Sequence, residues 1–105
     1  FGSGVVPSYS TSKGGIIQLT KSLAVGWAQN GINVNAILPG WITTDLTSEM
    51  GQSDPERYRK VSERIAIGKW GIPDDLAGAA IFLASKSSDY VTGASIVIDG
   101  GYSVN

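Results

Sequence analysis

The stretch that decides the fold of this 105-residue chain is GINVNAILPG, residues 31–40. Its centre, Ile32–Leu38, is short and rich in β-branched residues, and it is bounded by Gly31 and by the Pro39-Gly40 pair. A segment of this kind is typical of a strand that is buried on both faces. We therefore predict a strand over Ile32–Leu38.

A long amphipathic helix is predicted immediately before this strand, over Tyr9–Asn30. Ser8, which follows Pro7, is the expected N-cap, and Gly31 is the expected stop. A helix that leads directly into a buried strand indicates α/β construction. The apolar positions at helical spacing are Ile16, Leu19, Leu23 and Trp27.

A second helix is predicted from Ser53 to about Ile65, because Ser53-Asp54-Pro55-Glu56 is typical of a capping box with proline in the first turn. Within it, Glu56 and Lys60 have the spacing of a favourable ion pair. Basic residues are interleaved with acids along this helix, which favours a solvated face over an anion site. These basic residues are Arg57, Arg59, Lys60 and Arg64.

A third helix is predicted from Pro73-Asp74-Asp75, where both acids lie at the positive end of the helix. Ala94–Ile98 is apolar on both faces and predicts a second strand, with Asp99-Gly100-Gly101 as its turn. Pro39–Gly51 is expected to be a loop of functional length. It contains a candidate short helix, opened by Thr43, Thr44 or Asp45.

The two predicted strands are expected to be parallel, because a right-handed crossover joins strands in that way. Parallel sheets occur almost only where helices cover both faces, and two strands cannot make such a sheet alone. We therefore predict residues 1–105 to be a single partial domain of α/β class whose other strands are supplied upstream or by another chain.

Composition excludes several classes of function. Lys and Arg total 8 and Asp and Glu total 9, a formal charge of −1, so no basic field exists for a nucleic acid or an anionic membrane. The chain has no Cys and no His, which excludes a thiolate nucleophile, a Ser-His-Asp triad and the usual zinc sites. The nine carboxylates do not cluster, so no metal is expected.

Neither a membrane span nor a targeting segment is predicted. The longest near-apolar run, Leu76–Ala84, is far shorter than the roughly 20 residues that cross a bilayer. The chain opens at Phe1 without Met and without the regions of a signal peptide, so we expect a truncated chain. The absence of Cys is compatible with a cytoplasmic location, which is our expectation.

Tyr9 and Lys13 are the strongest candidates for proton chemistry. They are four residues apart at the start of the long helix, so both lie on one face. An ammonium beside a phenol favours the phenolate and lowers its pKa, which makes tyrosine usable as an acid or base near neutrality. A structural Tyr and a surface Lys remain the alternative at this point.

A second candidate site follows the first predicted strand. Pro39-Gly40-Trp41-Ile42-Thr43-Thr44 lies at the carboxyl end of that strand, the edge where open α/β sheets bind ligands. Taken alone, a Pro-Gly pair is more often a simple turn.

Four stretches combine along the chain: Tyr9-x-x-x-Lys13, Asn33-Val34-Asn35-Ala36-Ile37 with Pro39-Gly40 and Thr44, Pro73-Asp74-Asp75-Leu76-Ala77, and Tyr90-Val91-Thr92-Gly93 through Asp99-Gly100-Gly101. In this order they resemble the C-terminal part of the short-chain dehydrogenase/reductase (SDR) family, over essentially all 105 residues. The resemblance implies part of a Rossmann-like doubly wound parallel sheet, incomplete as given, and a homo-oligomer, commonly a tetramer.

The resemblance also implies an activity and a set of site residues. The activity is NAD(P)-dependent interconversion of a secondary alcohol and a ketone, with Tyr9 transferring the proton and Lys13 lowering its pKa and binding the nicotinamide ribose. The residues resembling the nicotinamide pocket of the family are Pro39, Gly40, Ile42, with a backbone contact, and Thr44, with a hydroxyl contact. Trp41 and the segment to Gly51 would border the substrate.

Several family features are absent from residues 1–105: the Gly-rich turn, the Asn-Ala-Gly segment and the catalytic serine. The chain alone is therefore expected to be inactive, and a non-catalytic assembly or binding module is the alternative. NAD and NADP are not distinguished, because the residue that reads the ribose 2′ position is missing. Sugar or polyol derivatives are the preferred substrates, while ketoacyl thioesters and steroids remain open.

Overall fold

The computed structural model describes residues 7–105, and the backbone alone at residues 7–10 and 46. The chain divides into two compact units, each described by itself: Phe1–Leu38 with Gly78–Ile96, and Pro39–Ala77 with Val97–Asn105. The helices are α1 (Pro7–Trp27), α2 (Asp45–Ser53), α3 (Pro55–Arg64) and α4 (Asp74–Ala84), with short 3₁₀ turns η1 (Ala28–Asn30), η2 (Lys86–Ser88) and η3 (Tyr102–Val104); the strands are β1 (Ala36–Pro39) and β2 (Ser95–Ile98).

The two strands form a parallel pair, as predicted. The Ala36 N–H donates to the carbonyl of Ala94, and the Gly40 N–H donates to the carbonyl of Ile98, both at 2.9 Å. Moving four residues along the chain, from Ala36 to Gly40, moves the acceptor four residues in the same direction, from Ala94 to Ile98, as a parallel ladder requires. Among the described residues these two strands make up the whole sheet.

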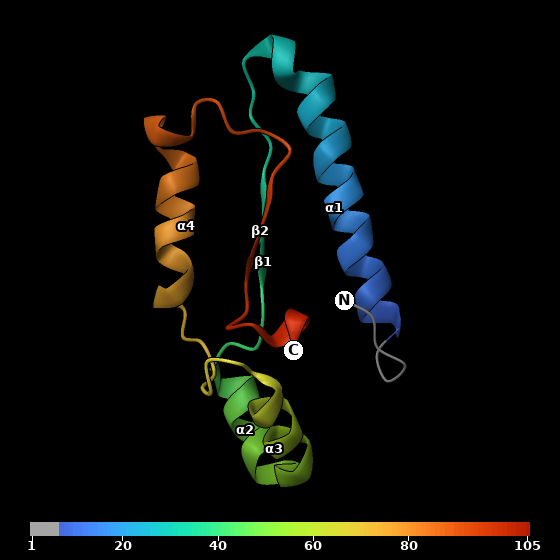
Figure 1. Ribbon diagram of the computed structural model, residues 1–105, viewed down its shortest axis with the longest axis vertical. Helices are drawn as coiled ribbons and strands as arrows, with labels where there is room; N and C mark the ends of the chain where they lie inside the picture. The colour runs from blue at the N-terminus through green and yellow to red at the C-terminus, as the bar shows by residue number, and fades with distance from the viewer. Residues whose placement is uncertain (1–6) are drawn as a thin grey trace. The chain divides into compact units, whose positions relative to one another are not determined.

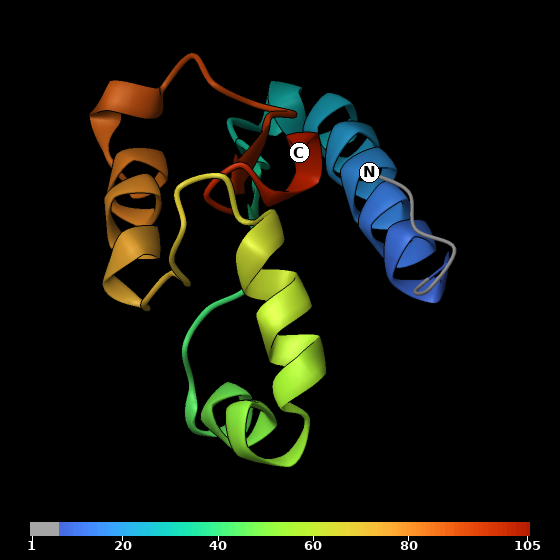
Figure 2. The same ribbon diagram turned by 60° about the horizontal axis from the view of Figure 1, so that its bottom comes forward.

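In the first unit, helices lie on both sides of this strand pair. Figure 1 shows α1 on one side of the strands and α4 on the other, and Figure 2 preserves this order. Ala24 of α1 is buried, and a Cβ at Gly93 would lie 3.5 Å from its Cβ, so the helix approaches the backbone closely there. The α/β class of the prediction is therefore confirmed.

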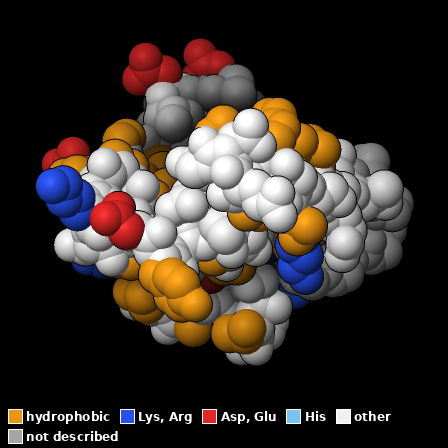
Figure 3. All heavy atoms as spheres, turned by 90° about the horizontal axis from the view of Figure 1, so that it is seen from above, with side chains coloured by type: hydrophobic (Ala, Val, Ile, Leu, Met, Phe, Trp, Pro, Cys, Tyr) orange, Lys and Arg blue, Asp and Glu red, His pale blue; other side chains and the backbone are white. Residues whose placement is uncertain are grey.

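The sheet is incomplete, also as predicted. Several large apolar side chains of the first unit are exposed, among them Leu19, Val25 and Ile81, with exposed fractions of 59–81 %. Figure 3 shows hydrophobic side chains in several groups on one face of the molecule. A doubly wound sheet covers such surfaces with further strands and helices, which these residues do not supply. Among the described helices, none is both long and apolar enough to cross a bilayer.

The ends of α1 were predicted correctly at one end only. Gly31 follows the helix with φ of +75°, and its N–H donates to Ala28, so the glycine stop is confirmed. Ser8 is not the N-cap, because the helix already includes Pro7. Proline is favoured in the first helical turn, since its fixed φ is helical and its missing N–H would have no partner there.

The strand predicted over Ile32–Leu38 is shorter than expected and begins at Ala36. Before that residue the backbone is held mainly through side chains. Asn35 donates through Nδ2 to the carbonyl of Val91 and accepts through Oδ1 from the Ala94 N–H, both at 3.0 Å. Asn33 donates to the carbonyl of Asp89 at 3.1 Å. We call these two side chains the asparagine clamp.

The clamp also explains the start of β2. Ala94 was predicted to open the strand, but its N–H bonds the Asn35 side chain and the ladder begins at Ser95. Two further bonds join the same segments: the Val34 N–H donates to the Thr92 hydroxyl at 3.0 Å, and the Gly93 N–H donates to the carbonyl of Val34 at 2.7 Å. Side chains therefore extend the strand pairing beyond its backbone ladder.

In the second unit, α2 occupies much of the segment predicted as a loop. Thr44 is its N-cap, one of the three residues proposed to open a helix there, and its hydroxyl accepts from the Thr47 N–H at 3.3 Å. Thr47 Oγ1 accepts in return from the Thr44 N–H at 2.7 Å. These two bonds form a reciprocal capping box.

The N-cap of α3 is Asp54 rather than Ser53, because its carboxylate accepts from the Arg57 N–H with Pro55 as first helical residue. The predicted Glu56–Lys60 pair is replaced by an ion pair between Glu56 and Arg59, 2.6 Å long. Arg59 also bonds Glu63, so one guanidinium bridges two carboxylates. The hydrogen bond from Arg59 and its positive charge hold the pKa of the Glu56 carboxyl below its usual value.

The first prediction concerns the asparagine clamp. Replacing Asn35 with Ala removes two hydrogen bonds and leaves the carbonyl of Val91 and the N–H of Ala94 without that partner. We expect the free energy of unfolding of the full-length protein to fall by about 2 kcal/mol or more, measured by urea denaturation. Asn30, exposed at the end of η1, provides the control Asn30→Ala; equal losses in both variants would contradict the clamp.

Candidate functional site

Tyr9 and Lys13 both lie within α1, in the first unit. Because the backbone is helical over both positions, they are one turn apart on the same face, as the sequence predicted. The Tyr9 side chain lies outside the described residues, and the Lys13 side chain is half-buried. Their proposed role in proton transfer therefore stays a prediction.

Pro39, Gly40, Ile42 and Thr44 lie together in the second unit, where Pro39 is the last residue of β1 and the other three follow it. Gly40 is required here by close packing. A Cβ at this position would lie 2.7 Å from the Cα of Asp99, a backbone atom that cannot move aside easily. The turn thus runs against the end of β2, and only glycine permits that approach.

Asp99 is held firmly on the other side of this contact. Its two carboxylate oxygens accept from the N–H groups of Gly101 and Ser103, each at 3.0 Å. Gly100 and Gly101 have positive φ, 61° and 86°, which the predicted turn after the second strand requires. Asp99 is therefore a structural carboxylate that fixes the backbone against which Gly40 lies.

Ile42 offers backbone groups at the turn. It forms a parallel bridge with Gly71, in which the Gly71 N–H donates to Trp41 and the Thr43 N–H donates to Gly71. In such a bridge the N–H and C=O of the central residue point away from the partner strand. The Ile42 carbonyl accepts from Thr47 Oγ1 at 3.0 Å. No backbone carbonyl among the described residues accepts from its N–H.

Thr44 has a hydroxyl that already works as a helix cap, and this side chain is exposed. The Thr44 hydroxyl oxygen accepts from the Thr47 N–H, which leaves the hydroxyl hydrogen available for donation. The nearest hydroxyl oxygen, Thr47 Oγ1, lies 3.3 Å away. The sequence offered Thr44 both as one of three residues that open a helix here and, by family resemblance, as a cofactor contact; the structure confirms the capping role. The turn therefore presents the Ile42 N–H as a backbone donor and the Thr44 hydroxyl.

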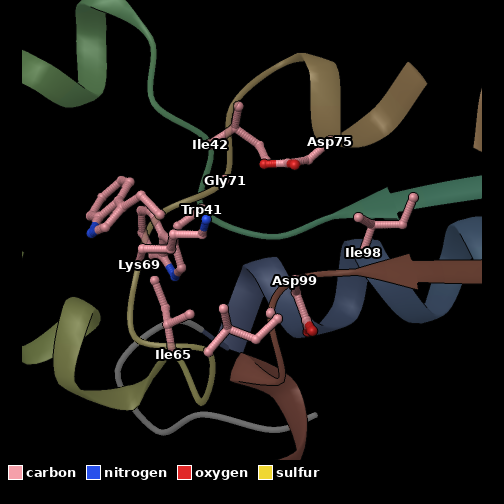
Figure 4. A pocket seen from close by; sticks show the side chains of 11 residues that line it. Trp41, Ile42, Ile65, Lys69, Gly71, Asp75, Ile98 and Asp99 are labelled. Atoms are coloured by element: carbon pink, nitrogen blue, oxygen red, sulfur yellow. The ribbon is translucent and has the colours of Figure 1, made fainter. Parts of the chain in front are cut away.

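The sequence did not predict the cavity beside this turn, which has a volume of about 230 Å³ and lies wholly in the second unit. Figure 4 shows its lining, with the Asp75 carboxylate close to the Ile42 side chain. The Asp75 carboxylate also accepts from the Ile72 N–H at 2.8 Å. Most of the lining is apolar: Trp41, Ile42, Ile65, Ile67, Trp70 and Ile98, with Lys69, Asp75 and Asp99 as charged members.

An aromatic cluster supports one wall of this cavity. Trp70 is buried, stacks on Tyr58 with ring centroids 4.7 Å apart, and donates from its indole N–H to the Ser62 hydroxyl at 2.8 Å. Trp41 lies against Trp70 at 5.5 Å and against Tyr102 at 6.1 Å. Trp41, the residue after Gly40, is therefore held in place by aromatic packing.

Metal chemistry has no evident ligands in this part of the chain. Within residues 7–105, no three carboxylates lie close enough together to hold an ion. Asp75 and Asp99 both line the cavity, but backbone N–H groups occupy oxygens of each. The site chemistry rests on backbone donors, a hydroxyl and the cations near the cavity.

Parallel strands flanked by helices, with a glycine turn at a strand's carboxyl end, are typical of doubly wound α/β folds such as the Rossmann fold. Residues 2–103 match the sequence model of the family described as Enoyl-(Acyl carrier protein) reductase. The chain belongs to the short-chain dehydrogenase/reductase family, as the sequence motifs predicted.

Two relatives and one solved structure illustrate this membership. The chain is 47 % identical over 97 residues to 2-dehydro-3-deoxy-D-gluconate 5-dehydrogenase of Dickeya dadantii, covering 92 % of this chain and 38 % of that protein. It is 44 % identical over 97 residues to galactitol 2-dehydrogenase (L-tagatose-forming) of Cereibacter sphaeroides, with the same two shares. It resembles a gluconate 5-dehydrogenase from Burkholderia cenocepacia in complex with NADP and tartrate, with a TM-score of 0.80, 38 % identity, and coverage of 92 % of this chain and 38 % of that one.

The chain therefore spans about two fifths of the length of these relatives. It contains the positions that match the tyrosine and lysine motif and the turn after β1.

The second prediction concerns the close approach at Gly40. A Gly40→Ala substitution places a methyl group against the Asp99 backbone, so we expect a loss of about 2 kcal/mol or more in unfolding free energy. The matched control is Gly78→Ala in α4, where nothing lies within 4 Å of the added atom. There the better helix propensity of Ala should stabilise by up to about 1 kcal/mol.

Thermal and urea unfolding of both full-length variants provide the measurement. A Gly40→Ala protein as stable as the wild type would show that Asp99 yields to the methyl group, and that the turn is not constrained by this contact.

Proposed function

We propose that the protein to which this chain belongs is an NAD(P)-dependent oxidoreductase that interconverts a secondary alcohol and a ketone. One observation carries the proposal: the Ile42 N–H, beyond the carboxyl end of β1, points away from its bridge partner, and no backbone carbonyl within residues 7–105 accepts from it. Relatives at 44–47 % identity are dehydrogenases, and the solved relative described above holds NADP.

The turn residues fit a nicotinamide carboxamide. An amide oxygen needs an N–H donor, which Ile42 supplies, and an amide nitrogen needs an acceptor such as the exposed Thr44 hydroxyl. Pro39 and Gly40 shape the backbone beside these two groups. When bound, the cofactor supplies or accepts the hydride. Trp41 and the segment to Gly51 border the substrate.

Tyr9 and Lys13 carry the proton in this proposal. The Tyr9 phenol donates a proton to the oxygen of the carbonyl substrate during reduction, and its phenolate takes the proton of the alcohol during oxidation. The Lys13 ammonium, one helical turn further on, stabilises that phenolate by its charge and binds the nicotinamide ribose hydroxyls. The direction of the reaction is set by the concentrations of alcohol and ketone, by the ratio of oxidised to reduced cofactor and by pH.

Substrate and assembly follow from the same reasoning. Sugar or polyol derivatives are the proposed substrates, since the relatives named above act on a deoxygluconate and on galactitol. Either NAD or NADP fits the residues of this chain, because no described residue reads the adenosine ribose. A cytoplasmic homo-oligomer, commonly a tetramer in this family, completes the proposal.

The third prediction is an activity loss in the full-length protein. Tyr9→Phe removes the transferable proton, and Lys13→Ala removes the stabilising charge, so we expect turnover of NAD(P)H to fall by about 10²- to 10⁴-fold with the fold retained. The measurement is steady-state absorbance at saturating cofactor, with circular dichroism to confirm folding.

Matched controls are available for both changes. Tyr90 is fully exposed, and Lys21 lies on α1 two turns beyond Lys13, so Tyr90→Phe and Lys21→Ala should keep wild-type turnover. Wild-type turnover by Tyr9→Phe would overturn the catalytic proposal. Absence of NAD(P)H turnover in the wild-type full-length protein would instead favour the alternative of a non-catalytic module, which buries its exposed apolar residues against a partner.

A further inference from the structure

The three arginines of α3 have different surroundings. Arg59 bonds the carboxylates of Glu56 and Glu63, so its charge is already paired with two carboxylates. Arg64 donates from Nε to the carbonyl of Asn105 at 3.1 Å and lies 4.6 Å from the ring centre of Tyr102. Among the side chains that the structure describes, no carboxylate forms an ion pair with Arg57. Arg57 therefore differs from Arg59 and Arg64, although the interleaved charges along α3 do not distinguish it in the sequence.

Arg57 is held by an aromatic ring instead. Its Cζ lies 5.8 Å from the centre of the Trp41 ring, within the range of a cation–π contact. The ring orients the guanidinium but accepts no conventional hydrogen bond from it, so the N–H fork keeps its donors for another group. The side chain is exposed, which leaves it accessible from solvent.

Trp41 connects this arginine to the candidate site. It directly follows Gly40 in the turn after β1, and it lines the cavity together with Lys69. The carboxylates in the same lining, Asp75 and Asp99, already accept hydrogen bonds from backbone N–H groups. Arg57 therefore lies over Trp41 and Lys69 lines the same cavity as Trp41, while the chain as a whole carries a formal charge of −1.

We propose that Arg57 is a specificity residue that binds a carboxylate of the substrate. This assigns the substrate to the polyhydroxy acids rather than to the neutral polyols. The inference rests on the proposed function, because it places the substrate beside Trp41. Guanidinium and carboxylate match as two parallel N–H···O bonds, and a guanidinium already placed by a cation–π contact loses less side-chain freedom when it binds.

The test compares binding of matched ligands to the full-length protein loaded with its cofactor. D-gluconate and D-glucitol differ only at the first carbon, which is a carboxylate in one and an alcohol in the other. A panel of such aldonate and alditol pairs, titrated by calorimetry, separates charge recognition from recognition of the hydroxyl chain. We expect the wild type to bind at least one aldonate tenfold or more tightly than its alditol.

Variants at two neighbouring arginines identify the residue responsible. Arg57→Gln should remove the preference for the aldonate while changing alditol affinity less than twofold, and Arg57→Lys should restore part of it. Arg59→Gln, two residues along the same helix, should keep the preference, because Glu56 and Glu63 already occupy that guanidinium.

The inference is overturned if no aldonate binds better than its alditol, or if Arg57→Gln keeps the wild-type preference. The proposed function fails separately, through turnover that is insensitive to Tyr9→Phe. If the carboxylate preference depends on Arg57 but the wild type shows no turnover, or turnover that Tyr9→Phe does not change, the anion site stands and the proposed catalytic role fails.

Discussion

The pairing of residues 33–40 with residues 89–98 is the constraint on which the rest of the structure depends. The backbone ladder between β1 and β2 is short, four residues on each strand. Ahead of it, the asparagine clamp and the Val34 bonds hold the incoming segment to residues 89–94. Because these bonds fix the register, they determine where β1 ends and where the Pro39-Gly40 turn begins.

The second unit is organised around Trp70 rather than around a sheet. The indole is buried, stacked on Tyr58 and hydrogen-bonded to Ser62, so its position is fixed by both shape and polarity. Val61 and Ile65 of the same region complete a small core. A functional site needs rigid support for the groups that bind its ligand. Here the aromatic core fixes the position of the turn, and the turn presents its hydrogen-bond donors.

Local signals predicted much of this fold, because they act over a few residues. Capping preferences explain the glycine stop at Gly31 and the two acids in the first turn of α4. Residue propensities explain the two strands, β1 and β2. Ser53 and Asp54 are both good N-cap residues. Asp54 is the cap because Pro55, which follows it, is favoured as the first helical residue. Arg59 displaced Lys60 as partner of Glu56 because it reaches carboxylates on both sides.

The remaining features depend on contacts between distant residues, which local patterns do not encode. Asn35 bonds Val91 and Ala94, which lie 56 and 59 positions further along the chain. Arg57 lies over Trp41 only because α2 and α3 fold back beside the turn, so an alternating charge pattern gave no reason to separate it from Arg59. The site residues themselves, Tyr9, Lys13 and the turn, were found through spacing and family resemblance; their chemistry stays a proposal.

The asparagine clamp has one further consequence, for how freely the sequence of its partner segment can vary. Both asparagines bond main-chain atoms, the carbonyls of Asp89 and Val91 and the N–H of Ala94. Every amino acid carries such a carbonyl, and every one except proline carries such an N–H. The asparagines therefore place no demand on the side chains of this segment. Thr92 is constrained separately by its hydroxyl bond to the Val34 N–H, and Gly93 by its φ of 77°, whereas Tyr90, whose side chain is wholly exposed, can vary without altering the strand register.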